Sequence, residues 1–381
     1  MLLELSSEQE FFQRTTARFL DGNVPVTELR RLRDDPAGFA SDYWRRGAEL
    51  GWTSLLVSER DGGVAVSSSG LVDLTLVAYE FGRHAAPGPL VSSNIVASAL
   101  SAASADPELI AGLLDGTSIG SWCFAEGAPN DGLGSTSFDI KVDGSELVLN
   151  GVKRPVESAD QASLFLVTGR TGAGLTQVVV PAGTKGVSLT PMRNVDLTKR
   201  FSVVKFDNVR VPAASVLGRV GKADDDVERQ LQQAVVILNA EAVGAMQRAF
   251  EMTLEWSFDR YSFGRSLASY QALKHRFANM ATWLQASHAI SDEAARAVAE
   301  KSPDAGELAS AAKAYIGDYG VELLQDCVQL HGGIGVTYEH DLHLYLRRGT
   351  LARALLGTPD VHRRRVAAFV AQKEEVVRRA Q

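Results

Sequence analysis

The part of the sequence that most constrains the fold is one long helical stretch and the sharp turn after it, between Leu238 and Gln271. Apolar or small residues recur there at three- and four-residue steps, which is the helical period: Leu238, Ala242, Ala245, Ala249 and Met252. Gly264 and the Ser- and Tyr-rich residues around it break this period. We therefore predict a helix, a short turn and the start of a second helix.

The two ends of this stretch carry different chemical groups. Glu241 is a carboxylate among small and apolar neighbours near the start of the helix, whereas Arg260 and Phe263 lie at its far end. A separation of 19 residues between Glu241 and Arg260 corresponds to roughly 28 Å of helix at a rise of 1.5 Å per residue. The two ends cannot contact the same small group.

Length, composition and charge are those of an ordinary globular protein. The chain has 381 residues, which suggests two or three domains with ample length to bury their cores. Apolar residues make up 45% and charged residues 22%, values that argue against disorder. A net charge of −7 leaves no basic footprint for nucleic acid.

Neither export, a membrane span nor a metal site is indicated. The first residues, MLLELSSEQEFF, lack the basic-then-apolar pattern of a signal peptide, and no apolar run is long enough to span a membrane. Cys123 and Cys327 lie far apart, without the spacing of metal ligands or of a disulfide framework. His340 and His343 lack the helical spacing of a zinc pair. We expect a soluble, cytoplasmic protein without a metal.

The pattern of helix and strand signals divides the chain into three regions. Residues 1–119 and 221–381 read as mostly helical. Residues 120–220 contain strand-like runs with turn residues every eight to twelve positions, a spacing typical of a small antiparallel barrel or sandwich. The dipeptides Asp143-Gly144 and Asn150-Gly151 predict hairpin turns on either side of one strand.

Local signals predict some element boundaries. Ser7 and Glu10 have the spacing of a capping box at the start of the first helix. Two amphipathic segments, HAISDEAARAVAEK and ELASAAKAYIGDYGVELLQDCVQL, are predicted as two further helices with Pro303 between them. The C-terminal segment HRRRVAAFVAQKEEVVRR is partly balanced by Glu374 and Glu375, which favours a surface helix.

Several segments, in a fixed order along the chain, resemble one known family: GWTSLLVSERDGG with YEFGR, LVLNGVK, FDNVRVPAASVLG, RYSFGRSLASYQALKHRFANM and QLHGGIG. Together they resemble the acyl-CoA dehydrogenase family over essentially the whole chain. The resemblance implies an α+β multidomain fold. It would have a helical N-terminal domain (residues 1–119), a middle antiparallel β-barrel-like domain (120–220) and a C-terminal four-helix bundle (221–381).

The resemblance also implies FAD as the cofactor, held at two places. Residues of the C-terminal region would contact the FAD of a neighbouring subunit: Arg260, Phe263, Gln271, Gln329, Gly332 and Gly333. An arginine fork matches phosphate oxygens, an aromatic ring offers a stacking face, and glycine lets the backbone approach a diphosphate. Trp122, Phe124 and Ala125 would face the flavin, and Thr358 is assigned to the cofactor site as well.

The chain departs from the family pattern beside the flavin. Alanine and glycine, at Ala125 and Gly127, replace a usual threonine and proline. Lys153 is followed by Arg-Pro-Val-Glu rather than by the usual Trp-x-Thr. Each lost hydroxyl removes a hydrogen bond worth about 0.5–1.5 kcal/mol. Such losses need not abolish flavin binding, because backbone N–H groups still donate.

The position of the catalytic base is the second departure. The resemblance implies that a carboxylate removes the α-proton of an acyl-CoA thioester while hydride leaves the β-carbon. The two family positions for this base match Leu356 and Ala234, which are both inert, although the backbone N–H of Leu356 could still bind a thioester oxygen. Glu241 is the candidate base, offset by about two turns, or roughly 10 Å, from the helical position. The alternative is a structural glutamate paired with Arg248 or with a partner chain.

Three functions follow from these observations. The first is an FAD-dependent acyl-CoA dehydrogenase that passes electrons to an electron-transfer flavoprotein or similar acceptor. The second is a non-catalytic subunit that lends FAD-binding residues to a homologous catalytic chain in a heterotetramer, and the third is a flavin-dependent oxidase. The pattern is similar to actinobacterial dehydrogenase subunits, some of which act on steroid side-chain thioesters. We expect a homo- or heterotetramer; the acyl group is left open.

Overall fold

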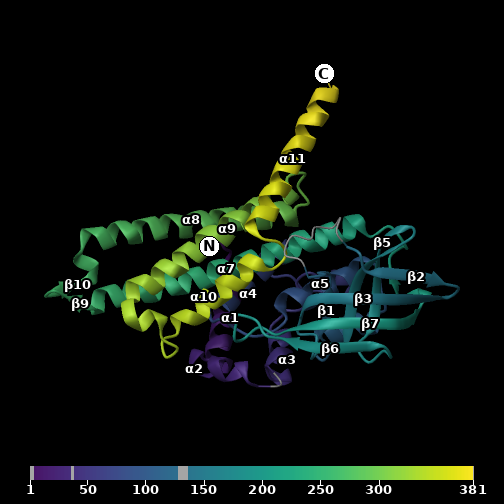
Figure 1. Ribbon diagram of the computed structural model, residues 1–381, viewed down its shortest axis with the longest axis horizontal. Coiled ribbons are helices and arrows are strands. Elements are labelled where there is room, and N and C mark those ends of the chain that lie inside the picture. Colours follow the sequence, from purple (N-terminus) through teal and green to yellow (C-terminus); the bar gives the residue numbers. More distant parts are fainter. Residues whose placement is uncertain (1–3, 36–37, 128–135, 381) are drawn as a thin grey trace.

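The structure is a computed structural model that describes residues 4–35, 38–127 and 136–380. Its N-terminal part is helical, as predicted, and ends before the first strand of a sheet (Figure 1). The N-terminal helices are α1 (Ser7–Asn23), α2 (Val26–Leu29), α3 (Ser41–Glu49), α4 (Gly70–Arg83), α5 (Leu90–Ala102) and α6 (Pro107–Leu114).

The capping box of α1 lies one residue earlier than predicted. The N-cap is Ser6, whose side chain accepts from the Gln9 backbone N–H at 3.2 Å, while the Gln9 side chain accepts from the Ser6 N–H at 3.1 Å. Gln9 can fill the third helical position because its side chain also donates to Asp73. A tertiary contact therefore decides between two overlapping capping signals.

The middle of the chain forms one mixed sheet of eight strands. The strands are β1 (Gly120–Cys123), β2 (Asp139–Asp143), β3 (Glu146–Glu157), β4 (Leu164–Thr171), β5 (Gly174–Pro181), β6 (Val187–Met192), β7 (Phe201–Pro212) and β8 (Val216–Leu217). The sheet order is β6-β7-β3-β2-β4-β5-β8, with β1 paired to β4. Because β1 and β2 run parallel to β4, the prediction of a purely antiparallel sheet is wrong, and across the described residues the sheet is not closed.

The prediction of a hairpin turn at Asn150-Gly151 is also wrong. Asp143-Gly144 does connect β2 to β3, but Asn150 and Gly151 lie inside β3 at a shift in its pairing with β7. Gly151 has a φ of +146°, and the Asn150 side chain accepts from the Asn208 N–H at 2.8 Å. The same dipeptide chemistry that favours a turn here serves a β-bulge.

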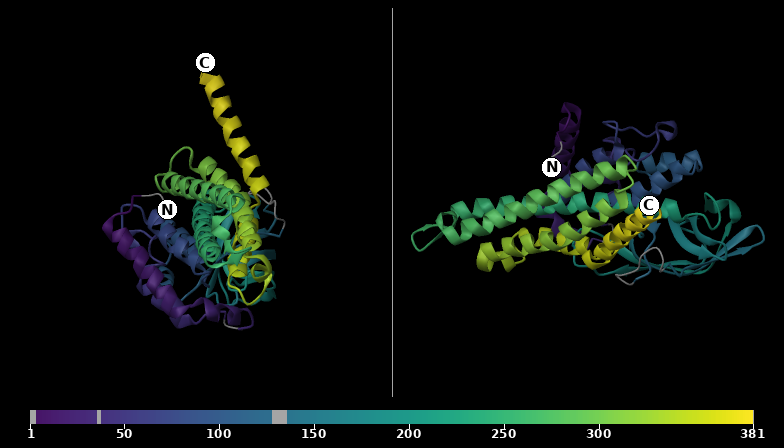
Figure 2. Two further views of the ribbon diagram at one scale, coloured as in Figure 1. Left: turned by 90° about the vertical axis from the view of Figure 1, so that its left-hand side faces the viewer. Right: turned by 90° about the horizontal axis from the view of Figure 1, so that it is seen from above.

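Long helices make up the C-terminal part and run side by side (Figures 1 and 2). The elements are α7 (Asp224–Asp259), β9 (Tyr261–Ser262), β10 (Arg265–Ser266), α8 (Gln271–Ala299), α9 (Ala305–His331), α10 (Leu342–Ala354) and α11 (Pro359–Ala380). The predicted helix, turn and second helix around Gly264 are confirmed. The segment HAISDEAARAVAEK is not a separate helix, because it continues α8 without a break. No helix in the described part of the chain could cross a membrane.

Helix α7 crosses α4 at very short range, and this crossing fixes the depth of Glu241. A Cβ on Gly82 of α4 would lie 1.9 Å from the backbone oxygen of Glu241, and a Cβ on Gly244 would lie 2.0 Å from that of Tyr79. Only glycine allows two helix backbones to approach so closely. The middle of α7 is therefore buried, with Glu241 fully inaccessible to solvent.

Candidate functional site

A cavity of about 330 Å³ lies where the sheet meets the C-terminal helices. Its walls come from α5, α7, α10 and the start of α11 on one side and from β1, β3 and β6 on the other. Seven residues named in the sequence analysis line it: Trp122, Phe124, Ala125, Gly127, Leu238, Glu241 and Leu356. Its volume lies in the range of cavities that hold cofactors and small molecules.

One wall of the cavity is aromatic and is fixed by backbone and charge contacts. The rings of Trp122 and Phe124 stack with centroids 4.7 Å apart. Behind them, the buried Lys153 donates to the Phe124 carbonyl at 3.0 Å and pairs with Glu126 at 2.6 Å. The Ala125 carbonyl accepts from the Arg154 N–H at 2.9 Å. The predicted flavin-facing segment is thus a rigid wall, although its side chains depart from the family pattern.

Glu241 contributes one paired and one unpaired carboxylate oxygen to this site. Its Oε1 pairs with Arg348 of α10 and lies 3.2 Å from the Lys199 Nζ. Its Oε2 is buried and has no hydrogen-bond partner among the described residues. The expected partner Arg248 lies instead 3.8 Å from Glu251, so that part of the prediction is wrong.

Arg348 joins Glu241 to two other segments of the chain, the loop between β6 and β7 and the residues that follow α4. It also pairs with Asp196 and donates to the Thr198 hydroxyl and to the carbonyls of Ala85 and Ala86, the last two at 3.1 Å. Burial works against the charge of Arg348, but Asp196 and Glu241 outweigh it, so its pKa is raised. Burial raises the pKa of Asp196, but the charge and hydrogen bond of Arg348 lower it by more, so the pKa of Asp196 lies below its ordinary value.

Lys199 extends the charged cluster to the sheet. Its ammonium lies 3.2 Å from Glu157 of β3 and donates to the Gly88 carbonyl at 3.3 Å. Burial alone would lower the pKa of Lys199, but Glu241 and Glu157 raise it above the ordinary value. Glu157 also accepts from the Ser92 N–H at 3.2 Å. We call Glu157, Asp196, Lys199, Glu241 and Arg348 the buried ion cluster.

A tight turn between α10 and α11 forms another part of the cavity wall. Leu356 has a φ of +57° and Gly357 a φ of +101°, both left-handed conformations. The Leu356 N–H makes no hydrogen bond to any residue in the described part of the chain, whereas the Gly357 N–H closes the hydrogen-bonded turn over Leu355 and Leu356. Thr358 itself is not part of the cavity lining; its carbonyl accepts from the His362 N–H at 3.1 Å.

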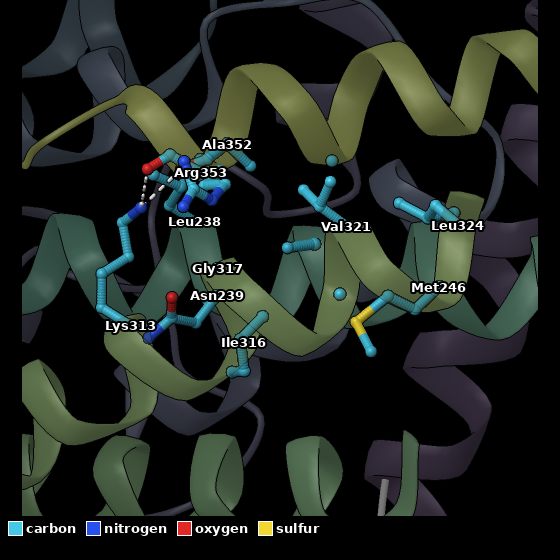
Figure 3. Close-up of a pocket in the computed structure, with 13 residues that line it drawn as sticks. Leu238, Asn239, Met246, Lys313, Ile316, Gly317, Val321, Leu324, Ala352 and Arg353 are labelled. Atoms are coloured by element: carbon cyan, nitrogen blue, oxygen red, sulfur yellow. Dashed lines mark hydrogen bonds between the residues drawn. The ribbon is translucent and has the colours of Figure 1, made fainter. Parts of the chain in front are cut away.

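Beside this turn, a small enclosed space of about 10 Å³ separates α7, α9 and α10 (Figure 3). Lys313 of α9 lies at one end of it and donates to the carbonyls of Ala352 and Arg353 at 2.6 and 3.2 Å. No carboxylate pairs with Lys313 in the described residues. Burial, together with Arg353, lowers the pKa of Lys313 to about 7.

The remaining predicted cofactor residues lie at the opposite end of α7, away from the cavity (Figure 1). Arg260 follows α7, Phe263 is at the tip of the β9–β10 hairpin and 97% exposed, and Gln271 starts α8. Gln329 lies in the last turn of α9, and beyond it a Cβ on Gly332 or Gly333 would meet open space. Contacts of Trp256 with Arg260 and with His331 bring these two groups together.

Sequence reasoning assigned no role in the site to Glu157, Asp196, Lys199, Lys313, Arg348 and His362. Arg347 and Arg348 are adjacent in α10, and neighbouring residues of a helix point in different directions. Their adjacency indicates that one of the two side chains can be buried, but it does not indicate which partner that side chain has. Lys199 and Asp196 lie in a loop between β6 and β7, where no periodicity distinguishes a buried charge from a solvated one. Among the described residues, no group of acidic, histidine or cysteine side chains could hold a metal ion.

Comparisons with known proteins agree over most of the chain. The models of the acyl-CoA dehydrogenase N-terminal domain and C-terminal domain match residues 6–109 and 226–371. The chain is 27% identical over 369 residues to acyl-CoA dehydrogenase IpdE2 of Mycolicibacterium smegmatis, covering 96% of this chain and 100% of that protein.

Two solved structures are similar over nearly their whole length. Butyryl-CoA dehydrogenase from Megasphaera elsdenii has a TM-score of 0.87 at 21% identity, with 97% of this chain and 100% of that one covered. A glutaryl-CoA dehydrogenase from Mycobacterium smegmatis, in complex with FADH2, has a TM-score of 0.84 at 20% identity, with 95% and 94% covered. At these identities the structures show a shared fold.

Proposed function

The chain belongs to the acyl-CoA dehydrogenase family, and from this premise we propose that it oxidises an acyl-CoA thioester between its α- and β-carbons with FAD as the cofactor. One observation carries the proposal for this chain: the 330 Å³ cavity joins an aromatic wall, an unpaired backbone N–H at Leu356 and an unpaired carboxylate oxygen of Glu241. These are the groups that removal of an α-proton beside a carbonyl requires.

The residues of the cavity fit a flavin ring. Trp122 and Phe124 offer apolar ring faces, and the backbone from Phe124 to Gly127 is held by Lys153 and Arg154. Glu157 does not oppose an uncharged ring, because Lys199 neutralises its carboxylate. Bound here, FAD would supply the acceptor for the hydride that leaves the β-carbon.

Roles for the chain's own groups follow from their places around the cavity. The N–H of Leu356 would donate to the thioester oxygen, where negative charge develops as the α-proton leaves. Glu241 would take that proton on Oε2 while Arg348 and Lys199 hold Oε1. A base held through one oxygen is limited to a narrow range of orientations, which favours a short and defined proton transfer.

A second chain is part of this proposal. Arg260, Phe263, Gln271, Gln329, Gly332 and Gly333 lie at the far end of the 36-residue helix α7, so they cannot reach the cavity of their own chain. We infer that they, with an arginine for the phosphates and open glycine backbone, bind the FAD of another copy or of a homologous chain. The same proposal includes three domains with a C-terminal four-helix bundle. It also includes a tetramer, an electron-transfer flavoprotein as the electron acceptor and a cytoplasmic location. Fatty-acyl or steroid side-chain catabolism belongs to it as well.

The other two functions have less support. The curated relative that the chain matches over its whole length is itself named an acyl-CoA dehydrogenase, which does not favour a non-catalytic subunit. An oxidase would need a path by which oxygen reaches the flavin, and none of the residues described around the cavity indicates such a path. Peroxide release in air would be the sign of the oxidase.

The test is to purify the chain alone and to measure bound flavin and acyl-CoA-dependent dye reduction without oxygen. We expect FAD in near-stoichiometric amount, and a kcat that Glu241→Gln lowers by about 10²–10⁴-fold, the usual contribution of a general base. The matched control is Glu251→Gln, a glutamate of the same helix that pairs with Arg83 outside the cavity. A Glu241→Gln kcat within tenfold of wild type would remove Glu241 from the role of base. A flavin-free, inactive chain that becomes active only with a homologous partner, and whose Glu241→Gln variant is equally active in that complex, would favour the non-catalytic subunit instead.

A further inference from the structure

Two buried nitrogen bases lie on either side of the turn that carries the unpaired N–H of Leu356. Lys313 donates to the carbonyls of Ala352 and Arg353 at the end of α10, just before the turn. His362, in the first turns of α11, lies 2.9 Å through its Nε2 from the carbonyl of Leu356, inside the turn. Both side chains are at most 2% exposed.

The contact between His362 and Leu356 defines the state of the imidazole. A carbonyl oxygen can only accept, so Nε2 carries the proton and donates it to Leu356. Burial, with Lys313 and Arg365 close by, lowers the pKa of His362 to about 4, so the ring is neutral at physiological pH. Its Nδ1 is then a bare lone pair, and this atom is buried without a partner among the described residues.

The turn needs such a restraint because its backbone is strained. Leu356 is a branched, non-glycine residue at a φ of +57°, a conformation that costs free energy unless its surroundings hold it. A Cβ on Gly357 would lie 3.0 Å from the His362 Nε2, so the ring packs directly on the turn. The backbone N–H of His362 also donates to the carbonyl of Thr358 at 3.1 Å, so the backbone of His362 is held close to the same turn.

We propose that His362 is a positioning residue that holds Leu356 in its left-handed conformation, so that the free Leu356 N–H points at the thioester carbonyl in the cavity. The hydrogen bond to the Leu356 carbonyl fixes the planar peptide that follows Leu356, and this limits rotation of the residue that carries the free N–H. Lys313 donates to the carbonyls of Ala352 and Arg353, just before the turn, and so restricts the motion of the backbone that enters it. This inference rests on the proposed function for its substrate.

A structural role alone explains these residues less well. Burying an imidazole nitrogen and a lysine ammonium without a counter-charge costs free energy that an apolar side chain of similar size would avoid. Both residues donate hydrogen bonds to carbonyls that lie within five residues of each other, at the end of α10 and in the turn that follows it. His288, by contrast, is an equally buried histidine with one unpaired nitrogen, but it contacts Gln247 between α7 and α8, away from the cavity.

The experiment compares His362→Leu, His362→Gln and His362→Asn with His288→Leu as the matched buried-histidine control. Glutamine can place an amide N–H near the position of Nε2, whereas asparagine is too short to reach Leu356. We expect kcat to fall by about 10²-fold in the Leu and Asn variants, the scale of a misplaced catalytic group. KM should change less than about threefold, and Gln should restore most of the rate.

A second readout does not depend on turnover. An acyl-CoA with two methyl groups on its α-carbon has no α-proton, and its ¹³C-labelled carbonyl can be followed by infrared difference spectroscopy when bound. In wild type the carbonyl band should shift to lower frequency; in His362→Leu and His362→Asn the shift should be lost, while His362→Gln and His288→Leu keep it. If His362→Leu fails to fold, the Gln and Asn pair gives the same comparison.

The outcomes separate the two proposals. A shifted band in wild type without turnover of any acyl-CoA would contradict the proposed function but support this inference. An unchanged band in the Leu and Asn variants, or an equal loss in His288→Leu, would overturn the role of His362 even if the enzyme is active.

Discussion

Replacing Arg348 by methionine tests the buried ion cluster most directly. Methionine keeps much of the side-chain volume but removes the guanidinium that pairs with Glu241 and Asp196. Both carboxylates are at most 5% exposed, so each would be left buried with fewer compensating charges. Removing one partner of a buried ion pair typically costs about 3–5 kcal/mol.

This cost can be converted into a shift of the unfolding temperature. An unfolding entropy of about 2.1 cal/mol/K per residue gives roughly 0.8 kcal/mol/K for a chain of this length. A loss of about 4 kcal/mol then lowers the midpoint by roughly 5 °C. The measurement is thermal unfolding by calorimetry or circular dichroism at neutral pH.

The matched control is the neighbouring Arg347→Met. Arg347 lies in the same helix, but its contacts are the His343 ring at 3.3 Å and the exposed Val195 carbonyl at 3.1 Å. We expect its midpoint to change by no more than about 1 °C, as for other partly exposed charges. In Arg348→Met, adding Glu241→Gln should recover part of the loss because one unpaired charge is removed. Equal effects of the two arginine variants would refute the reasoning.

Three further predictions concern other parts of the molecule. Because the pKa of Lys313 is about 7 when folded and near 10.5 when unfolded, only the unfolded chain holds this proton between those values. The free energy of unfolding therefore rises with pH above about 7, by up to about 1.4 kcal/mol per pH unit, because the cost of the buried ammonium is relieved. Unfolding measured between pH 6 and 9 should show this rise in wild type and not in Lys313→Met. Parallel pH profiles for the two proteins would contradict the prediction. Gly82→Ala should lower the melting midpoint by several degrees because its Cβ would lie 1.9 Å from a backbone oxygen, whereas Gly22→Ala, with nothing within 4 Å, should raise stability by about 0.5–1 kcal/mol. Arg260→Ala should leave the melting midpoint unchanged but lower flavin retention during gel filtration; unchanged retention would remove Arg260 from the cofactor site.

Elements with a local signal could be predicted from the sequence. The period of apolar residues predicted α7, and Gly264 predicted the turn before α8, because both depend on neighbours within a few positions. The prediction from the Asn150-Gly151 dipeptide is wrong for the same reason: locally the dipeptide favours a turn, but pairing of β3 with β7 on both sides of it makes a bulge instead. Tertiary pairing overrides a dipeptide preference whenever both flanking strands gain partners.

The candidate site depended on contacts that no local pattern contains. Glu241 and Arg348 are 107 positions apart, and Arg348 and Asp196 are 152 apart. The sequence identified Glu241 as a carboxylate in an apolar helix and offered Arg248 as its partner, since helical neighbours are what a sequence displays. Only the α4–α7 crossing, with its two glycines, brings Glu241 deep enough to meet Arg348.

The composition of the buried ion cluster bears on the role of Glu241. Three carboxylates (Glu157, Asp196 and Glu241) face two cations (Lys199 and Arg348), so the cluster holds one negative charge in excess. A buried charge is costly unless hydrogen bonds or an opposite charge compensate it. Arg348 lowers the pKa of Asp196, and both oxygens of Glu157 accept hydrogen bonds. The oxygen of the cluster that is left without a partner among the described residues is Glu241 Oε2, and Glu241 is one of the residues that line the cavity, so the uncompensated part of the cluster lies where the proposed reaction needs a base.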